Sequence, residues 1–143
     1  AEKELRDKYL ENIRLDLEKD REALSQNIEK LNQNTKTINQ IMPYLGRNLP
    51  GKDTVARRFF SLAVLVNFRP HDITYQSLIN SGDFKLIDNF ELKASIEEHY
   101  SGYKNILQDY KRQENINKNY LADYFIYEID YNEIVKGNFM FYL

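Results

Sequence analysis

The stretch Thr74–Tyr100, TYQSLINSGDFKLIDNFELKASIEEHY, decides the fold. Its pattern indicates a short amphipathic helix, a stop at Ser81-Gly82, a tight apolar turn and the start of a long helix. Glycine directly after a helix favours the left-handed conformation that ends it. Asn89 (or Asp88) can cap the next helix, because its side-chain oxygen accepts from a first-turn N–H. The stretch therefore predicts a corner between two helices.

A long helical pattern precedes this corner, over about residues 4–42. Apolar residues recur every seven positions, at Leu10, Leu17, Leu24, Leu31 and Ile38. The companion positions are only partly apolar, because Asp20, Asn27 and Asn34 dilute the stripe. A two-stranded zipper needs both positions filled over several heptads. We therefore expect a long helix packed in a bundle.

Two short helices are expected between this helix and the last one. Pro43 removes a helical N–H and ends the first pattern. Residues 54–68 repeat apolar side chains at helical spacing, with Asp53 or Thr54 as the cap. The second short helix covers about residues 73–82.

The last helical pattern runs over about residues 89–130. The chain has only five glycines and three prolines, too few for the turns of an all-β protein. We predict an all-α, elongated up-and-down helical bundle in which two long helices bracket two short ones. At this length, residues 1–143 are expected to form a single domain.

Composition and charge argue against several classes of protein. Twenty basic and 22 acidic residues leave a net charge of −2, whereas a general nucleic-acid binder needs a basic face. A helix-turn-helix reading of the corner also fails, because Glu91, Glu97 and Glu98 on its second helix would be repelled by phosphates.

The absence of cysteine excludes disulfides and thiolate sites. No apolar run is long enough to span a membrane.

The sequence offers no clear catalytic or metal-binding motif. It contains no GxSxG, P-loop or GxGxxG pattern. His71 and His99 lie on different elements, and a Glu-x-x-His diiron motif would need glutamate where Ile96 stands. The run Glu97, Glu98 and His99 is expected to be a solvated helix face. We predict no enzyme, no cofactor and no metal site. A cleft with a pair of convergent carboxylates would instead support an enzymatic function.

Charge is distributed unevenly along the chain. Residues 47–71 carry five basic side chains and one acidic one, and residues 109–133 carry an acidic excess. The two segments could pair within the fold. Alternatively, Arg57, Arg58 and Arg69 form a candidate contact for an anion, a lipid headgroup or a partner.

Aromatic residues gather in the C-terminal segment, between Tyr120 and Tyr142. Tyrosine suits positions where the ring is buried and the hydroxyl is wet, both at bundle edges and at partner interfaces. The segment can pack onto the bundle itself or form an interface with another chain. The candidate interface residues are Tyr124, Phe125, Phe139, Phe141 and Tyr142.

Two blocks resemble a large, uncharacterised bacterial family of membrane-anchored proteins. They are YLENIRLDLEKD (Tyr9–Asp20) and LINSGDFKLIDNFELKASIEEHY (Leu78–Tyr100). The family shares a YLxNLxxDLxxD opening and a later LxSGxLxLIxNxxLxxxIxxYY block. The chain departs from this pattern at Ile13-Arg14, Phe84 and His99. The resemblance implies a transmembrane helix upstream of a helical, extracytoplasmic (periplasmic) domain tethered to the inner membrane, and brings no catalytic residues.

We therefore expect a non-enzymatic extracytoplasmic interaction domain of a membrane-anchored protein, whose partner is a protein or a second copy of the chain. No nucleic acid is expected as a partner. The alternative is a ligand-sensing helical bundle coupled to an upstream transmembrane helix. A pocket lined by Phe59, Tyr75 and Tyr103 with an unpaired arginine would favour this alternative.

Overall fold

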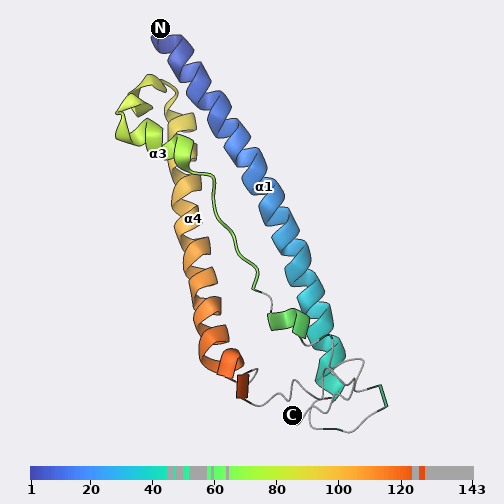
Figure 1. Cartoon of the computed structure of the whole chain (residues 1–143). Coiled ribbons are helices and arrows are strands. Elements are labelled where there is room, and N and C mark those ends of the chain that lie inside the picture. Colours follow the sequence, from blue (N-terminus) through green and yellow to red (C-terminus); the bar gives the residue numbers. More distant parts are fainter. Residues whose placement is uncertain are drawn as a thin grey trace. The chain divides into compact units, whose positions relative to one another are not determined.

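The computed structural model describes residues 1–44, 47, 50–51, 58, 60–63, 65–123 and 126–127. Its α-helices are α1 (Glu2–Ile41), α3 (Ile73–Asn80) and α4 (Phe90–Ile116) (Figure 1). Short 3₁₀ turns cover Met42–Tyr44, Phe60–Ala63 and Asp83–Leu86, and a π-helical turn covers Asn117–Leu121. No strand occurs among the described residues. The predicted all-α fold is confirmed.

The ends of α1 and α3 and the start of α4 lie close to where the sequence predicts them, whereas α4 ends at Ile116 and the π-helical turn at Asn117–Leu121 follows it. α1 ends at Ile41, just before Pro43. Gly82 ends the turn after α3 with a φ of 75°, a left-handed conformation that costs glycine little. The backbone N–H of Leu92 donates to Oδ1 of Asn89 at 2.9 Å. Asn89 is therefore the predicted cap of α4.

The helix predicted over residues 54–68 is wrong in its last part. Residues 65–68 are not helical, whereas among the described residues before them Arg58 is helical and Phe60–Ala63 forms a 3₁₀ turn. Pro70 disfavours a helical conformation at the residue before it. The Phe68 side chain is 2% exposed and meets the Tyr103 ring edge-on at 5.4 Å. Burial of this ring therefore favours the irregular backbone. The predicted caps Asp53 and Thr54 lie outside the described residues.

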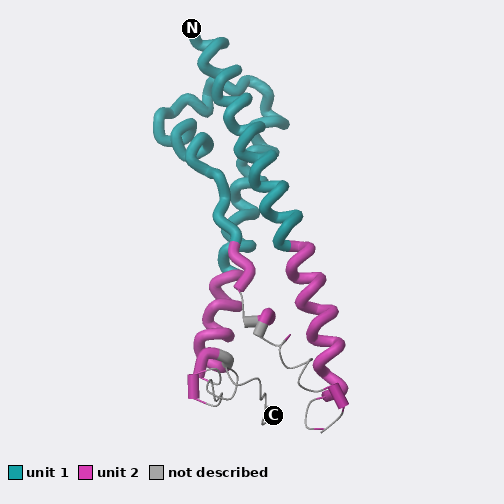
Figure 2. The backbone as a smooth tube through the Cα atoms, turned by 45° about the vertical axis from the view of Figure 1, so that its right-hand side comes forward, with its two compact units in different colours: residues 1–27, 68–109 teal, residues 28–67, 110–143 magenta. Residues whose placement is uncertain are grey.

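The chain divides into two compact units (Figure 2). The first unit contains residues 1–27 and 68–109, and the second contains residues 28–67 and 110–143.

Within the first unit, α1 and α4 run in the same direction. Arg6 near the start of α1 approaches Asp88 before α4 at 3.7 Å, and Asp20 meets Tyr103 farther along both helices. Two helices of one chain can run parallel only if the segment between them returns to the starting end. The returning segment, residues 68–83, lies along α1 and runs in the opposite direction.

The returning segment is fastened to α1 by hydrogen bonds between polar side chains. The Tyr9 hydroxyl donates to Asp83 at 3.0 Å. The Thr74 hydroxyl donates to Asp16 at 2.6 Å. The first unit also has an apolar core, in which Ile13, Leu78, Ile87 and Ile96 are all buried. Ile87, in the apolar turn of the predicted corner, is 2% exposed.

The second unit contains the rest of the heptad stripe of α1. Here Leu31 is 38% exposed and Ile38 is 45% exposed, whereas Ile41 is buried. A pocket of about 140 Å³ lies in this unit, lined by Leu31, Asn34, Leu62, Leu65, Val66, Gln113, Ile116 and Asn117.

Candidate functional site

The carboxylate of Asp20 is the polar centre of the first unit. Its side chain is 1% exposed. It accepts from the backbone N–H of His71 at 2.9 Å, from Nδ1 of His71 at 2.7 Å and from the Tyr103 hydroxyl at 2.6 Å. A buried charge is costly unless it is fully hydrogen-bonded. Asp20 meets this condition by joining α1 both to the loop before α3 and to α4.

The donor and acceptor roles around Asp20 follow from chemistry. An ionised carboxylate only accepts, so Nδ1 of His71 carries a proton. The Tyr103 hydroxyl donates its one O–H hydrogen bond to Asp20. Its oxygen can then only accept from Nε2 of His99, which therefore donates to it at 2.7 Å. Burial, followed by the hydrogen bond to Asp20, holds the pKa of Tyr103 well above its usual value. The cluster is a chain of hydrogen bonds with both histidines at its ends.

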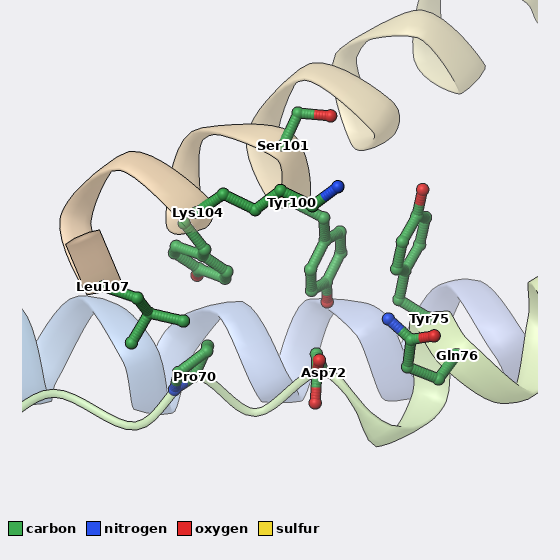
Figure 3. A pocket seen from close by; sticks show the side chains of 9 residues that line it. Pro70, Asp72, Tyr75, Gln76, Tyr100, Ser101, Lys104 and Leu107 are labelled. Atoms are coloured by element: carbon green, nitrogen blue, oxygen red, sulfur yellow. The ribbon is translucent and has the colours of Figure 1, made fainter.

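A pocket of about 180 Å³ lies beside this cluster (Figure 3). Three tyrosine rings form much of its wall. Tyr75 stacks on Tyr100 with ring centroids 4.2 Å apart, and Tyr103 meets Tyr100 edge-on at 5.6 Å. The full lining is Pro70, Asp72, Tyr75, Gln76, Tyr100, Ser101, Tyr103, Lys104 and Leu107.

The Tyr100 hydroxyl is an unusual feature of this wall. Tyr100 is 6% exposed, and its hydroxyl oxygen has no hydrogen-bond partner among the described residues. Figure 3 shows the hydroxyl end of the ring directed toward Asp72. Burial, together with the negative charges of Asp16, Asp20 and Asp72, raises the pKa of Tyr100 to about 12. Native proteins pair the great majority of such buried groups, so this hydroxyl marks a possible ligand contact.

Two opposite charges line the same pocket without pairing. Asp72 stands at the N-cap of α3 but makes no side-chain capping bond. Lys104 extends from α4, one turn after Tyr100 (Figure 3). Among the described residues, no ion pair joins either of them to another side chain. The pocket therefore offers an acidic group and a basic group to a bound molecule.

The histidines partly follow their sequence-based interpretation. His71 lies in the loop before α3, on a different element from His99, and donates to Asp20. His99 is exposed, as predicted for a solvated face, but its ring also bonds the buried Tyr103. Asp20 was missed, because it was counted as a polar dilution of the stripe. Its position in an otherwise apolar repeat was the signal that could have found it.

The structure describes two of the three arginines that were predicted to form a contact. Arg58 lies in the second unit, where it donates to Oε1 of Gln40 at 2.6 Å. Arg69 belongs to the first unit and is exposed. Arg57 lies outside the described residues. The arginine contact stays a prediction.

The predicted aromatic interface, made of Tyr124, Phe125, Phe139, Phe141 and Tyr142, lies outside the described residues. Three neighbours in the same segment are described and exposed: Tyr120 at 74%, Ile126 at 61% and Tyr127 at 77%. Large apolar side chains at this exposure are available for contact with another surface.

Among the described residues, no three His, Cys, Asp or Glu side chains are grouped to hold a metal ion. None of the described helices has the length and apolar character needed to cross a membrane. Comparison with family models, curated proteins and solved structures found no match to the chain. The family resemblance therefore stays a prediction.

Proposed function

We propose that this chain is a non-enzymatic helical domain that senses a small molecule bound in the tyrosine-lined pocket of its first unit. The observation that carries the proposal is the buried Tyr100 hydroxyl, which belongs to a residue that lines the pocket and has no partner among the described residues. An unsatisfied buried hydroxyl costs about 1–3 kcal/mol. A ligand that bonds it recovers this free energy.

The pocket also contains two of the three aromatic residues that the sequence associated with sensing. Tyr75 and Tyr103 line it, whereas Phe59 lies outside the described residues. The unpaired arginine named with them is not among the residues that line the pocket, whose one basic residue is Lys104.

A bound molecule would be coupled to α1 through the cluster around Asp20. The pocket wall includes Tyr103 and the residues on either side of His71. Both Tyr103 and His71 bond Asp20 on α1. A ligand that shifts α4 or the loop must therefore shift or break bonds to α1. This coupling supports a sensing role better than a catalytic one, because hydrogen bonds occupy both carboxylate oxygens of Asp20.

The test is a binding screen with a matched pair of tyrosine variants. A library of small polar compounds would be screened by ligand-observed NMR and thermal shift. Tyr100→Phe removes the unpartnered hydroxyl, so it should abolish pocket binding without lowering the stability of the free protein. Tyr9→Phe is the control, because its hydroxyl bonds Asp83 outside the pocket lining. Compounds that bind both variants equally would contradict the proposal.

We further propose that the domain is extracytoplasmic and tethered to the inner membrane in a longer protein. The support is the resemblance carried by Tyr9–Asp20 and Leu78–Tyr100. Cell fractionation of the complete gene product tests this part. Recovery in the cytosolic fraction, with no upstream transmembrane helix in the gene, would refute it.

A second candidate function is protein interaction through the C-terminal aromatic segment. The supporting observation is the exposure of Tyr120, Ile126 and Tyr127. We expect the chain to self-associate, and Tyr127→Lys to shift it toward monomer in light scattering. A wild-type chain that stays monomeric at high concentration would leave only a different protein as the partner.

A further inference from the structure

The tyrosine-lined pocket has a distribution of charge that restricts what it can hold. Its acidic side is Asp72, in the loop before α3, and its basic side is Lys104 on α4. Pro70 and Leu107 add apolar wall. A molecule that fits all three features carries a cation, an anion and a short apolar part.

The acidic side is suited to an ammonium group. The negative charges of Asp16, Asp20 and Asp72 all act on the Tyr100 hydroxyl. Asp16 already bonds Thr74, and Asp20 already bonds His71 and Tyr103. Asp72 alone among these three has no side-chain bond in the described structure. An ammonium N–H can donate to the Tyr100 oxygen while its charge pairs with Asp72.

The tyrosine rings reinforce this preference. A cation is attracted to the face of an aromatic ring, and three tyrosines line the pocket. A carboxylate at the same point would be repelled by the surrounding acidic groups.

The basic side is suited to a carboxylate. Lys104 follows Tyr100 by four positions, so both side chains leave the same face of α4. The hydroxyl of Ser101 lines the pocket as well and can donate to an anion. Asp72 and Lys104 stay apart although they share one small pocket, and a molecule with both charges can bridge them.

The volume of the pocket limits how much of a molecule it can enclose. Its volume is about 180 Å³. A cavity of about 150 Å³ accepts benzene, so about ten non-hydrogen atoms or fewer can enter.

We infer that the pocket binds a free α-amino acid with a short apolar side chain, with its ammonium between Tyr100 and Asp72 and its carboxylate at Lys104. This inference rests on the proposed sensing function and names its ligand class.

The experiment is isothermal titration calorimetry with compounds that differ only in charge. L-Valine, L-leucine and L-methionine are the zwitterions. 3-Methylbutylamine has the side chain of leucine without the carboxylate, and 4-methylpentanoate has it without the ammonium. At least one amino acid should bind. For leucine, the amine should bind at least about tenfold more weakly and the acid more weakly still.

Variants of the charged residues locate the two ends of the molecule. Asp72→Asn should weaken binding of amino acid and amine about ten- to hundredfold. Lys104→Met should weaken the amino acid and leave the amine unchanged. Asp7→Asn is the control, because Asp7 is exposed and outside the pocket. Far-UV circular dichroism should show all three variants folded.

Two outcomes overturn the inference in different ways. If 4-methylpentanoate binds as tightly as leucine, or if the library yields only Tyr100-dependent ligands without an ammonium group, the ligand class is wrong and the sensing function stands. If no amino acid and no library compound binds in a Tyr100-dependent way, both the inference and the proposed function fail.

Discussion

Replacement of Asp20 by alanine is expected to be among the most destabilising single changes in the first unit. The change leaves the Tyr103 hydroxyl and the backbone N–H of His71 without their acceptor. Each unpaired buried donor costs about 1–3 kcal/mol. The His71 ring adds little, because its side chain is 47% exposed and water can replace the bond. We therefore expect a loss of about 3–5 kcal/mol in the free energy of unfolding, as for other broken buried pairs.

Urea unfolding followed by far-UV circular dichroism measures this loss. The control is Asp7→Ala, which breaks only an exposed contact with Arg6 and should cost at most about 0.5 kcal/mol. A double-mutant cycle with Tyr103→Phe isolates the bond to Tyr103. Its coupling energy should be about 1.5–3 kcal/mol, the range for hydrogen bonds to charged groups. A loss below about 1 kcal/mol for Asp20→Ala, or additive effects in the cycle, would refute the role assigned to Asp20.

Three other predictions use the same unfolding assay. The pKa of Tyr100 is raised from 10.0 to about 12, so the folded state keeps its proton longer than the unfolded state, and stability should fall by about 2–3 kcal/mol as pH rises through this window. Tyr100→Phe should remove that part of the alkaline loss, and an unchanged pH profile would contradict the shift. Gly82→Ala should cost about 1 kcal/mol, because φ is 75° while an added Cβ meets nothing within 4 Å. Gly102→Ala, inside α4 and equally free of contacts, should instead stabilise by about 0.5–1 kcal/mol, and equal effects at the two glycines would rule out backbone conformation as the cause. Asn89→Ala should cost about 1 kcal/mol through loss of the cap on α4, whereas an unchanged stability would mean that the bond to Leu92 contributes nothing.

The ends of α1 and α3 and the start of α4 were predictable from the sequence because they depend on local chemistry. The stop at Gly82 and the cap at Asn89 each act within a few residues of their own position. The apolar repeat of α1 extends over many turns, so its period was clear. Such signals need no knowledge of the tertiary structure.

The candidate site was not predictable in the same way, because it depends on contacts between distant residues. Asp20 and Tyr103 are 83 positions apart, and their bond appears only when α1 and α4 lie together. The irregular backbone before Pro70 also depends on such a contact, since Phe68 packs on the Tyr103 ring. The apolar pattern of residues 65–68 was therefore assigned to a helix, whereas tertiary packing holds this segment in another conformation.

The polar contacts of α1 with the returning segment have a mechanical consequence. Tyr9, Asp16 and Asp20 face Asp83, Thr74 and His71 in turn. Eleven residues separate the outer two positions on α1, close to three whole helical turns, so the bonds lie along one line of the helix. A slide of α1 by one turn, about 5.4 Å, would break all of them together. Within the first unit, α1 therefore has one register, and any movement along this line is a discrete step instead of a gradual slide.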